Sequence, residues 1–172
     1  MVLLKCIDGV TVEVAETVAL KSKMLKHALE ESIPERFIPL DNITGEVMFK
    51  IVDYMAMQTE LESKKPQEIV EKSPELEGEV AKAEEALKAW KQTVVTWEEK
   101  YMDVSMNMLY DLFLGANFMD IQGLLSLCAE KIANLIKGKT VKEIRKTFNI
   151  TNDFTPEEEE EYQKKYEWAF SD

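Results

Sequence analysis

The chain has 172 residues, 45% of them hydrophobic, and a formal net charge of −12 at pH 7. This length fits one domain, or one domain with an appendage, and no apolar run approaches the roughly 18 residues that a membrane span needs. The negative charge argues against binding to nucleic acid or anionic membranes, which depends on lysine and arginine neutralising phosphates. Because MVLLKCIDG at the N-terminus enters a strand pattern directly, unlike a signal peptide, we expect a soluble intracellular protein.

Short strands are predicted at the start of the chain. Residues 3–7 are mostly apolar, and the valines of 10–14 alternate with polar residues. Asp8-Gly9 between them is a strong signal for a two-residue hairpin. Residues 37–40 predict another strand, and Pro39 places it at an edge of the sheet because proline has no N–H to donate to a neighbour.

Helices are predicted after Ser22, Thr44 and Ser105, which are all residue types that cap helix N-termini. From 58 to 88, glutamate and lysine dominate and few large apolar residues remain. Because such a segment cannot offset the entropy of ordering through burial, we predict a charged flexible linker there. Residues 79–91 are a candidate helix, since alanine, glutamate, lysine and leucine favour helices.

Three helical segments follow in residues 117–170. Asp120 is predicted to cap the first of them, whose apolar residues recur at three- and four-residue spacing until Gly138 ends it. Thr140 and Glu143 have the spacing of a capping box, so a second and shorter helix is predicted to begin there.

The third of these helices has the strongest start signal in the chain. Thr155 can cap it, Pro156 fits the first helical position, and Glu158 completes another capping box. Five consecutive glutamates, 157–161, occupy the first turns, where the helix dipole favours negative charge. Consecutive helical residues point around the cylinder and do not converge, so we interpret the run as capping and solvating the helix, not as a cation site.

Alternating short strands and helices, followed by helices alone, predict an α+β domain. Several stretches also resemble the Skp adaptor family, its plant members in particular, whose proteins link F-box proteins to a cullin in SCF ubiquitin ligases. These stretches are Gly115-Ala116-Asn117-Phe118, Ile136-Lys137-Gly138-Lys139-Thr140, Ile144-Arg145-Lys146-Thr147-Phe148-Asn149-Ile150, Asn152-Asp153-Phe154-Thr155-Pro156-Glu157-Glu158 and Trp168-Ala169-Phe170. The resemblance implies the BTB/POZ fold with a C-terminal two-helix extension.

The resemblance also implies an organisation and a role. A BTB/POZ domain would span 1–127, interrupted by the charged linker at about 58–88, and an F-box-binding helical extension would span 128–172. The implied role is a non-catalytic adaptor that bridges F-box substrate receptors to a cullin, and through it to a RING subunit, for protein ubiquitination in the nucleus and cytoplasm. We expect no cofactor, no metal, no nucleic acid and no membrane partner, and weak self-association of the free protein.

Two sets of binding residues carry over from the family. The positions that match F-box contacts are Ile132, Ile136, Ile144, Phe148, Ile150, Asn152 and Trp168. The positions that match the cullin-contacting pair are Asn117 and Phe118, where the family more often has tyrosine than phenylalanine. Loss of a buried hydroxyl contact costs about 1–3 kcal/mol, so we expect this chain to bind cullin more weakly.

Other interpretations remain beside the adaptor. The chain could be a different BTB-class scaffold, elongin-C-like or self-associating, or a divergent paralogue with weakened cullin binding. Elongin-C-like chains end before the segment from Ile136 onward, and self-associating BTB proteins usually carry an extra N-terminal extension, so both comparisons favour the adaptor. A thiol enzyme using Cys128 and His27 is disfavoured, because Cys128 lies on an apolar stripe with nothing nearby to lower its pKa.

One alignment question stays open. Trp90 and Trp97 both match the tryptophan that marks the family's return into the core after the linker. If Trp90 is the equivalent residue, then 93–97 are an insertion in this chain.

Overall fold

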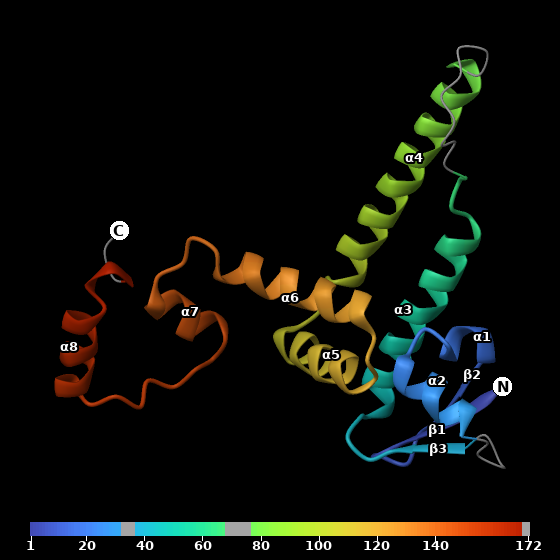
Figure 1. Cartoon of the computed structure of the whole chain (residues 1–172). Helices are drawn as coiled ribbons and strands as arrows, with labels where there is room; N and C mark the ends of the chain where they lie inside the picture. Colours follow the sequence, from blue (N-terminus) through green and yellow to red (C-terminus); the bar gives the residue numbers. More distant parts are fainter. Residues whose placement is uncertain (32–36, 68–76, 170–172) are drawn as a thin grey trace. The chain divides into compact units, whose positions relative to one another are not determined.

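The computed structural model describes residues 1–31, 37–67 and 77–169 of the chain (Figure 1). It divides into two compact units, Met1–Cys128 and Ala129–Asp172, whose boundary falls within helix α6 (Gln122–Ile136). Within the described ranges, no helix combines the length and the apolarity that crossing a membrane requires.

A three-stranded sheet opens the first unit. Its strands are β1 (Val2–Cys6), β2 (Thr11–Val14) and β3 (Phe37–Leu40), in the order β2-β1-β3. β1 pairs antiparallel with β2 through the predicted hairpin, and Gly9 adopts a φ of 82° in its turn, which only glycine reaches without strain. β3 pairs parallel with β1 at the edge, as Pro39 predicts. The predicted hairpin and edge strand are thus confirmed.

The other regular elements of the described chain are helices. In the first unit they are α1 (Glu16–Ala19), α2 (Lys23–Glu30), α3 (Gly45–Ser63), α4 (Glu77–Tyr101) and α5 (Met106–Phe118). After α6 come α7 (Val141–Thr147), α8 (Pro156–Lys165) and a 3-10 turn, Glu167–Ala169. α3 lies at the centre of the first unit and packs against α1, β2 and α5. The predicted α+β class is confirmed.

Helix α3 begins where predicted, but its N-terminus is satisfied differently. The Thr44 side chain makes no capping hydrogen bond. Instead the carboxylate of Asp8, in the hairpin turn, accepts a hydrogen bond from the Gly45 N–H at 2.9 Å. Gly45 lies so close to Val10, the residue before β2, that an added Cβ would be 2.6 Å from the Val10 Cβ. The turn of the hairpin therefore positions the central helix.

The predicted flexible linker over 58–88 is wrong where helices occupy it, at 58–63 and 77–88, whereas 65–67 have no regular structure. The candidate helix over 79–91 is confirmed as part of α4. α3 continues through Ser63 and α4 begins at Glu77, while residues 68–76 lie outside the described residues. Leu61 is buried, and its carbonyl accepts a hydrogen bond from the Trp90 indole N–H at 3.0 Å.

The linker prediction failed because it averaged composition over the whole segment. Apolar side chains in α4 recur at alternating three- and four-residue steps and all are at least half-buried: Val80, Ala83, Leu87, Trp90, Val94, Trp97 and Tyr101. A stripe of this spacing gives a helix one apolar seam even when the rest of its surface is charged.

Both candidate tryptophans lie on this seam. The Trp97 ring stacks on Tyr101 with centroids 4.9 Å apart and lies 5.8 Å from the ring of Tyr54 in α3. Trp90 lies two helical turns before Trp97 on the seam, and the Lys65 ammonium is 5.7 Å from its ring centroid. Each therefore ties α4 to the α3 side of the first unit.

Three buried side chains of the first unit, Tyr54, Tyr101 and Cys128, resist ionisation. Burial raises the pKa of Tyr54 to about 12 and that of Cys128 to about 11, and it also raises the pKa of Tyr101. The Tyr101 hydroxyl donates a hydrogen bond to the Lys50 carbonyl at 2.8 Å. In the unfolded chain tyrosine ionises near pH 10, so the stability contributed by the neutral buried rings is complete below that pH and is lost as pH rises toward the folded values.

We therefore expect the free energy of unfolding to fall between pH 8 and pH 11, and to fall by about 1 kcal/mol less in Tyr54→Phe, since one pKa unit corresponds to about 1.4 kcal/mol. Urea unfolding at the two pH values measures this difference. The matched control is Tyr110→Phe, whose ring is 62% exposed in the folded protein, and it should leave the pH dependence of wild type in place. If Tyr54→Phe and wild type lost the same free energy of unfolding between the two pH values, the raised pKa of Tyr54 would be contradicted.

Candidate binding surfaces

The end of α5, which holds the predicted cullin-contacting pair, is clamped to α2. Ser22 is the one fully buried polar residue among those described. Its hydroxyl donates to the Met119 carbonyl at 2.5 Å and accepts from the Leu25 N–H at 3.1 Å, so it caps α2 and anchors the end of α5 at once. The predicted Ser22 and Ser105 caps are both confirmed.

Asp120 follows this clamp and does not cap α6 as predicted. It adopts a left-handed φ of 49°, and its carboxylate accepts a hydrogen bond from the Gln122 side chain at 2.7 Å. The Lys23 ammonium lies 3.5 Å from the same carboxylate. The Gln122 hydrogen bond and the nearby Lys23 charge hold the pKa of Asp120 below its usual value. The turn that follows Phe118 is thereby fixed.

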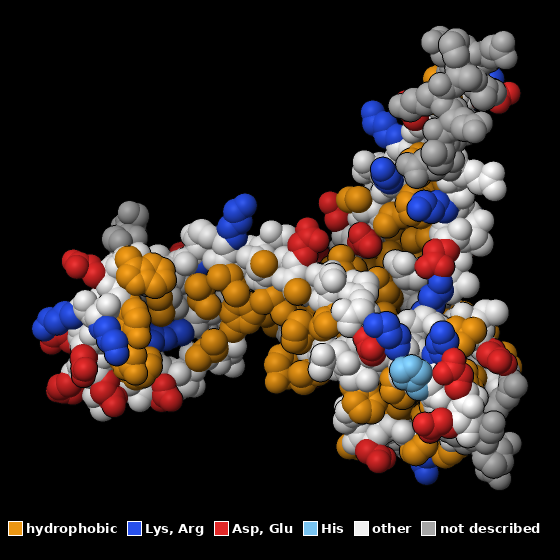
Figure 2. Space-filling model, viewed as in Figure 1, with side chains coloured by type: hydrophobic (Ala, Val, Ile, Leu, Met, Phe, Trp, Pro, Cys, Tyr) orange, Lys and Arg blue, Asp and Glu red, His pale blue; other side chains and the backbone are white. Residues whose placement is uncertain are grey.

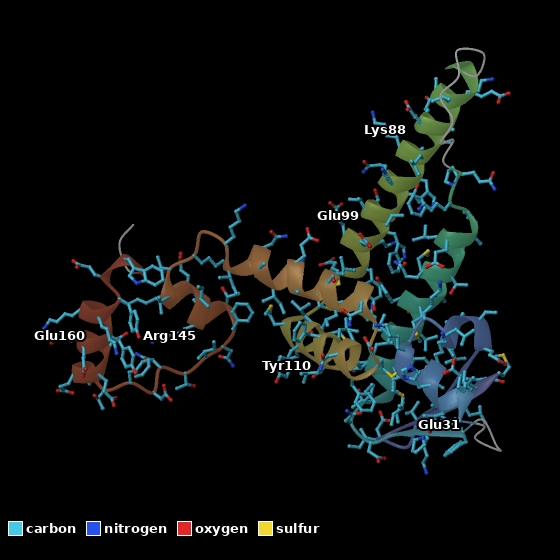
Figure 3. The ribbon with its side chains drawn as sticks, viewed as in Figure 1. Glu31, Lys88, Glu99, Tyr110, Arg145 and Glu160 are labelled. Atoms are coloured by element: carbon cyan, nitrogen blue, oxygen red, sulfur yellow. The ribbon has the colours of Figure 1, made fainter. Side chains whose placement is uncertain are left out.

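An apolar stripe lies on the exposed side of α5. Asn117 is exposed, and Phe118 is 42% exposed. Tyr110 and Leu114 lie eight and four residues before Phe118, on the same face, and are 62% and 47% exposed. We call Tyr110, Leu114 and Phe118 the α5 stripe; Figure 3 shows Tyr110 on α5, away from the sheet. The sequence prediction missed the first two, although their four-residue spacing before Phe118 was a usable signal.

The opposite face of α5 explains why the stripe faces outward. Gly115 is buried, and a Cβ at this position would be 2.8 Å from the Ile51 side chain of α3. Leu109, Leu112 and Ala116 are buried on the same side. Close packing of this face against α3 leaves the stripe on the solvent-exposed side of α5.

The predicted F-box residues all lie in the second unit, and none is fully buried. Ile132 and Ile136 are on α6, Ile144 is on α7, and Phe148 ends α7. Ile132, Ile144 and Phe148 are half-buried, whereas Asn152 is exposed. The exposed fractions are 39% for Ile136, 55% for Ile150 and 78% for Trp168.

A backbone motif groups Phe148 and Ile150. Asn149 adopts a left-handed φ of 53°, which ends α7. The Ile150 N–H then donates to the Arg145 carbonyl at 2.8 Å, as in a Schellman motif. The chain thus turns back on α7. The predicted capping boxes at Thr140 and Thr155, which start α7 and α8, are both confirmed.

An ion pair joins α7 to α8. Arg145 on α7 lies 3.1 Å from Glu159 on α8, and both side chains are largely covered, at 20% and 31% exposure. Asn152 donates to the other oxygen of Glu159 at 3.4 Å. Figure 3 shows Arg145 between the two helices, whereas Glu160 points away from them.

Glu159 corrects the interpretation of the glutamate run as capping and solvation alone. Glu158 belongs to the capping box, and Glu160 makes an exposed pair with Lys164 at 2.8 Å. Glu159 is the one glutamate of the run that is partly buried. A run of identical residues hides which member faces inward, so the sequence offered no signal beyond helical spacing.

An aromatic ladder, Phe154, Tyr162 and Tyr166, lies beside this ion pair. The rings of Phe154 and Tyr162 are 5.0 Å apart between centroids, and those of Tyr162 and Tyr166 are 6.1 Å apart and inclined by only 13°. The Arg145 guanidinium lies 5.7 Å from the Phe154 centroid. All three rings are about 40% exposed.

Neither cysteine is suited to nucleophilic chemistry. Cys6 and Cys128 are both buried free thiols, and burial raises the pKa of each above its ordinary value. Among the described residues, no group of three histidine, cysteine, aspartate or glutamate side chains is arranged to hold a metal ion.

Comparison with known proteins assigns both units. Residues 1–60 match the family model described as "Skp1 family, tetramerisation domain", and residues 122–169 match "Skp1 family, dimerisation domain". The chain is 38% identical to SKP1-like protein 20 of Oryza sativa subsp. japonica, covering 99% of this chain and 94% of that protein. It is also 38% identical to SKP1-like protein 1A of Arabidopsis thaliana, covering 98% and 96%. SKP1-like protein 11 of Arabidopsis thaliana is 36% identical over 99% of this chain and 97% of its own length.

The Arg145–Glu159 pair makes a prediction about the second unit. Glu159→Gln should lower the opening free energy of α7 and α8 by about 1 kcal/mol, because it weakens a largely covered charged hydrogen bond. Native-state amide exchange in 141–165 measures this change. Glu160→Gln, the neighbouring control in an exposed pair, should change it by less than about 0.5 kcal/mol. Equal effects of the two substitutions would show that Glu159 does not join the helices.

Proposed function

The chain belongs to the Skp1 family, and on that basis we propose that it acts as the non-catalytic adaptor of an SCF ubiquitin ligase, holding F-box proteins on one surface and a cullin on the other. Its first unit has the BTB/POZ fold, and its second is the helical extension. The observation that carries the proposal is the contrast in burial between these two units. The core is confined to the first unit, while the described part of the second unit contains no fully buried residue.

The second unit supports the F-box assignment. Its helices have seven and ten residues, and isolated helices below roughly 12–15 residues are marginal in water. Apolar side chains remain exposed on them and on the connecting turn, among them Ile136, Ile150 and Trp168. A partner laid over this unit would supply the burial that the unit lacks. F-box helices, for which Ile132, Ile136, Ile144, Phe148, Ile150, Asn152 and Trp168 are the proposed contacts, are that partner.

The α5 stripe supports the cullin assignment. It belongs to the well-packed first unit, and it includes Phe118 with Asn117 beside it. Adding Tyr110 and Leu114 gives the surface the length of two helical turns. A cullin helix packed along this stripe would bury three large side chains. The hydroxyl that the family's tyrosine would add at position 118 is therefore one contact among several.

The two proposed surfaces share no residue, which a bridging subunit requires. One lies on α5 in the first unit, and the other begins at Ile132 and lies in the second. Substitutions in one surface should therefore leave binding at the other intact. Self-association of the free protein is a further part of the proposal, since the matched family models are described as dimerisation and tetramerisation domains.

Reciprocal substitutions test the two surfaces. Phe118→Ala should weaken binding of a cullin N-terminal domain about tenfold or more and leave F-box affinity unchanged, because aromatic anchors dominate interface energies. Phe148→Ala should do the opposite, so each variant is the control for the other. Calorimetry with both partners measures all four affinities. Equal cullin affinity of Phe118→Ala and wild type would remove Phe118 from the interface, and binding of neither partner by wild type would refute the adaptor role.

The second unit should gain order on binding. In the free protein, amides after Lys137 should exchange quickly, and an added F-box domain should protect them strongly, because the partner supplies the missing burial. Truncation after Lys139 should abolish F-box binding and leave the first unit folded and able to bind cullin. Hydrogen exchange with and without the F-box domain measures the coupling. Slow exchange beyond Lys137 in the free protein would show that the unit is already ordered.

A further inference from the structure

A cavity of about 260 Å³ opens between α7 and α8, beside the aromatic ladder. It is lined by Val141 and Arg145 from α7, Glu159, Tyr162 and Tyr166 from α8, and Phe154 and Trp168 from the flanking segments. Its one pair of charged groups, Arg145 and Glu159, neutralises itself at 3.1 Å. The occupant that this lining favours is therefore apolar and packs against rings.

The size and ring geometry narrow the occupant further. Small-molecule pockets usually have about 300–1,000 Å³, so this cavity suits one or two side chains of a peptide better than a free metabolite. Tyr162 and Tyr166 present nearly parallel rings one helical turn apart. Grooves lined by such rings dock proline-containing segments in the polyproline II conformation. The tyrosine hydroxyls can donate to the carbonyls that this conformation leaves without internal partners.

The surroundings of the ladder set the charge of the ligand. Residues 152–169 contain seven carboxylates and two lysines, and Lys164 is already paired with Glu160 at 2.8 Å. Figure 2 shows hydrophobic side chains in a column along α8, with acidic side chains below it and on its outer side and a few basic ones beside it. A ligand with arginine or lysine beside its prolines complements this rim.

A cation held by the rings alone fits the site less well. Arg145 already lies 5.7 Å from the Phe154 centroid, and Lys165 lies 5.6 Å from that of Tyr166. The rings of Phe154 and Tyr166 are thus each already close to a cation of the chain itself. The apolar cavity between α7 and α8 is left for an uncharged side chain.

We propose that the aromatic ladder, the cavity and the acidic rim of α8 form a docking site for a basic, proline-containing segment of a partner protein. The extended segment would lie across Tyr162 and Tyr166, place a proline in the cavity against Phe154, and direct its arginine or lysine toward the glutamates of α8. The site shares Trp168 with the proposed F-box contacts. It does not depend on the adaptor role, because it needs neither the α5 stripe nor a bound F-box helix.

A synthetic decapeptide of eight prolines with an arginine at each end tests the proposal on the full chain. Backbone amide NMR shifts should change saturably at residues 141–168. Replacing the prolines with alanines, or the arginines with glutamates, should weaken binding about tenfold, the equivalent of one good contact. Shifts confined to the first unit, no binding, or equal affinity for either altered peptide would overturn the assignment.

Variants of the chain separate ring stacking from misfolding. Tyr166→Ala should weaken peptide binding about tenfold, whereas Tyr166→Phe should retain most of it, because the ring supplies the main contact. Val141→Trp should block binding by filling the cavity from α7 while leaving the ladder in place. The control Phe49→Ala removes a ring that is 52% exposed in the first unit and should bind as wild type does. Wild-type affinity in both Tyr166→Ala and Val141→Trp would refute the site.

Discussion

Burial of apolar side chains is the constraint on which the two halves of this protein differ. In the described ranges, every fully buried side chain lies at or before Cys128. In the first unit the other elements pack around α3. Asp8 fixes the start of α3, Gly115 allows α5 to pack closely against it, and the ring of Tyr54 in α3 contacts the ring of Trp97 in α4. The described residues beyond Cys128 form no such core, so the second unit relies on interactions between residues near in sequence.

Those local interactions are individually small. Two capping boxes, the turn at Asn149 and the Arg145–Glu159 pair each contribute on the order of 1 kcal/mol. Together they define the conformation of α7 and α8 without making it strongly favoured over open states. Because part of this stabilisation is electrostatic, salt should weaken it more than it weakens the first unit. A unit held in this way has a defined surface and still responds to what binds it.

The same division explains what could be predicted from the sequence. Caps, the hairpin and the edge strand were predictable because Ser22, Asp8-Gly9, Pro39, Thr140 and Thr155 act within a few residues of themselves. The candidate helix over 79–91 was predictable from composition and lies within α4. Its packing against the end of α3 was missed because the partner of Trp90 is Leu61, 29 residues earlier, and composition carries no information on that pairing. Tyr110 and Leu114 were missed because their exposure depends on how Gly115 packs against Ile51.

Asp120 was misjudged as a helix cap because its left-handed backbone turns its carboxylate toward the Gln122 side chain.

The two proposed surfaces should consequently bind by different routes. The α5 stripe is supported by buried Leu109, Leu112 and Ala116 and by the Ser22 clamp, so a cullin helix meets a surface whose shape changes little. An F-box partner must order α7 and α8 as it binds, and the entropy lost there is subtracted from its affinity. Substitutions that stabilise the second unit without touching a partner should therefore tighten F-box binding and leave cullin binding alone. By the same reasoning, a ligand that holds α7 against α8, as a proline segment on the aromatic ladder would, lowers the ordering cost for the F-box partner wherever both can bind at once.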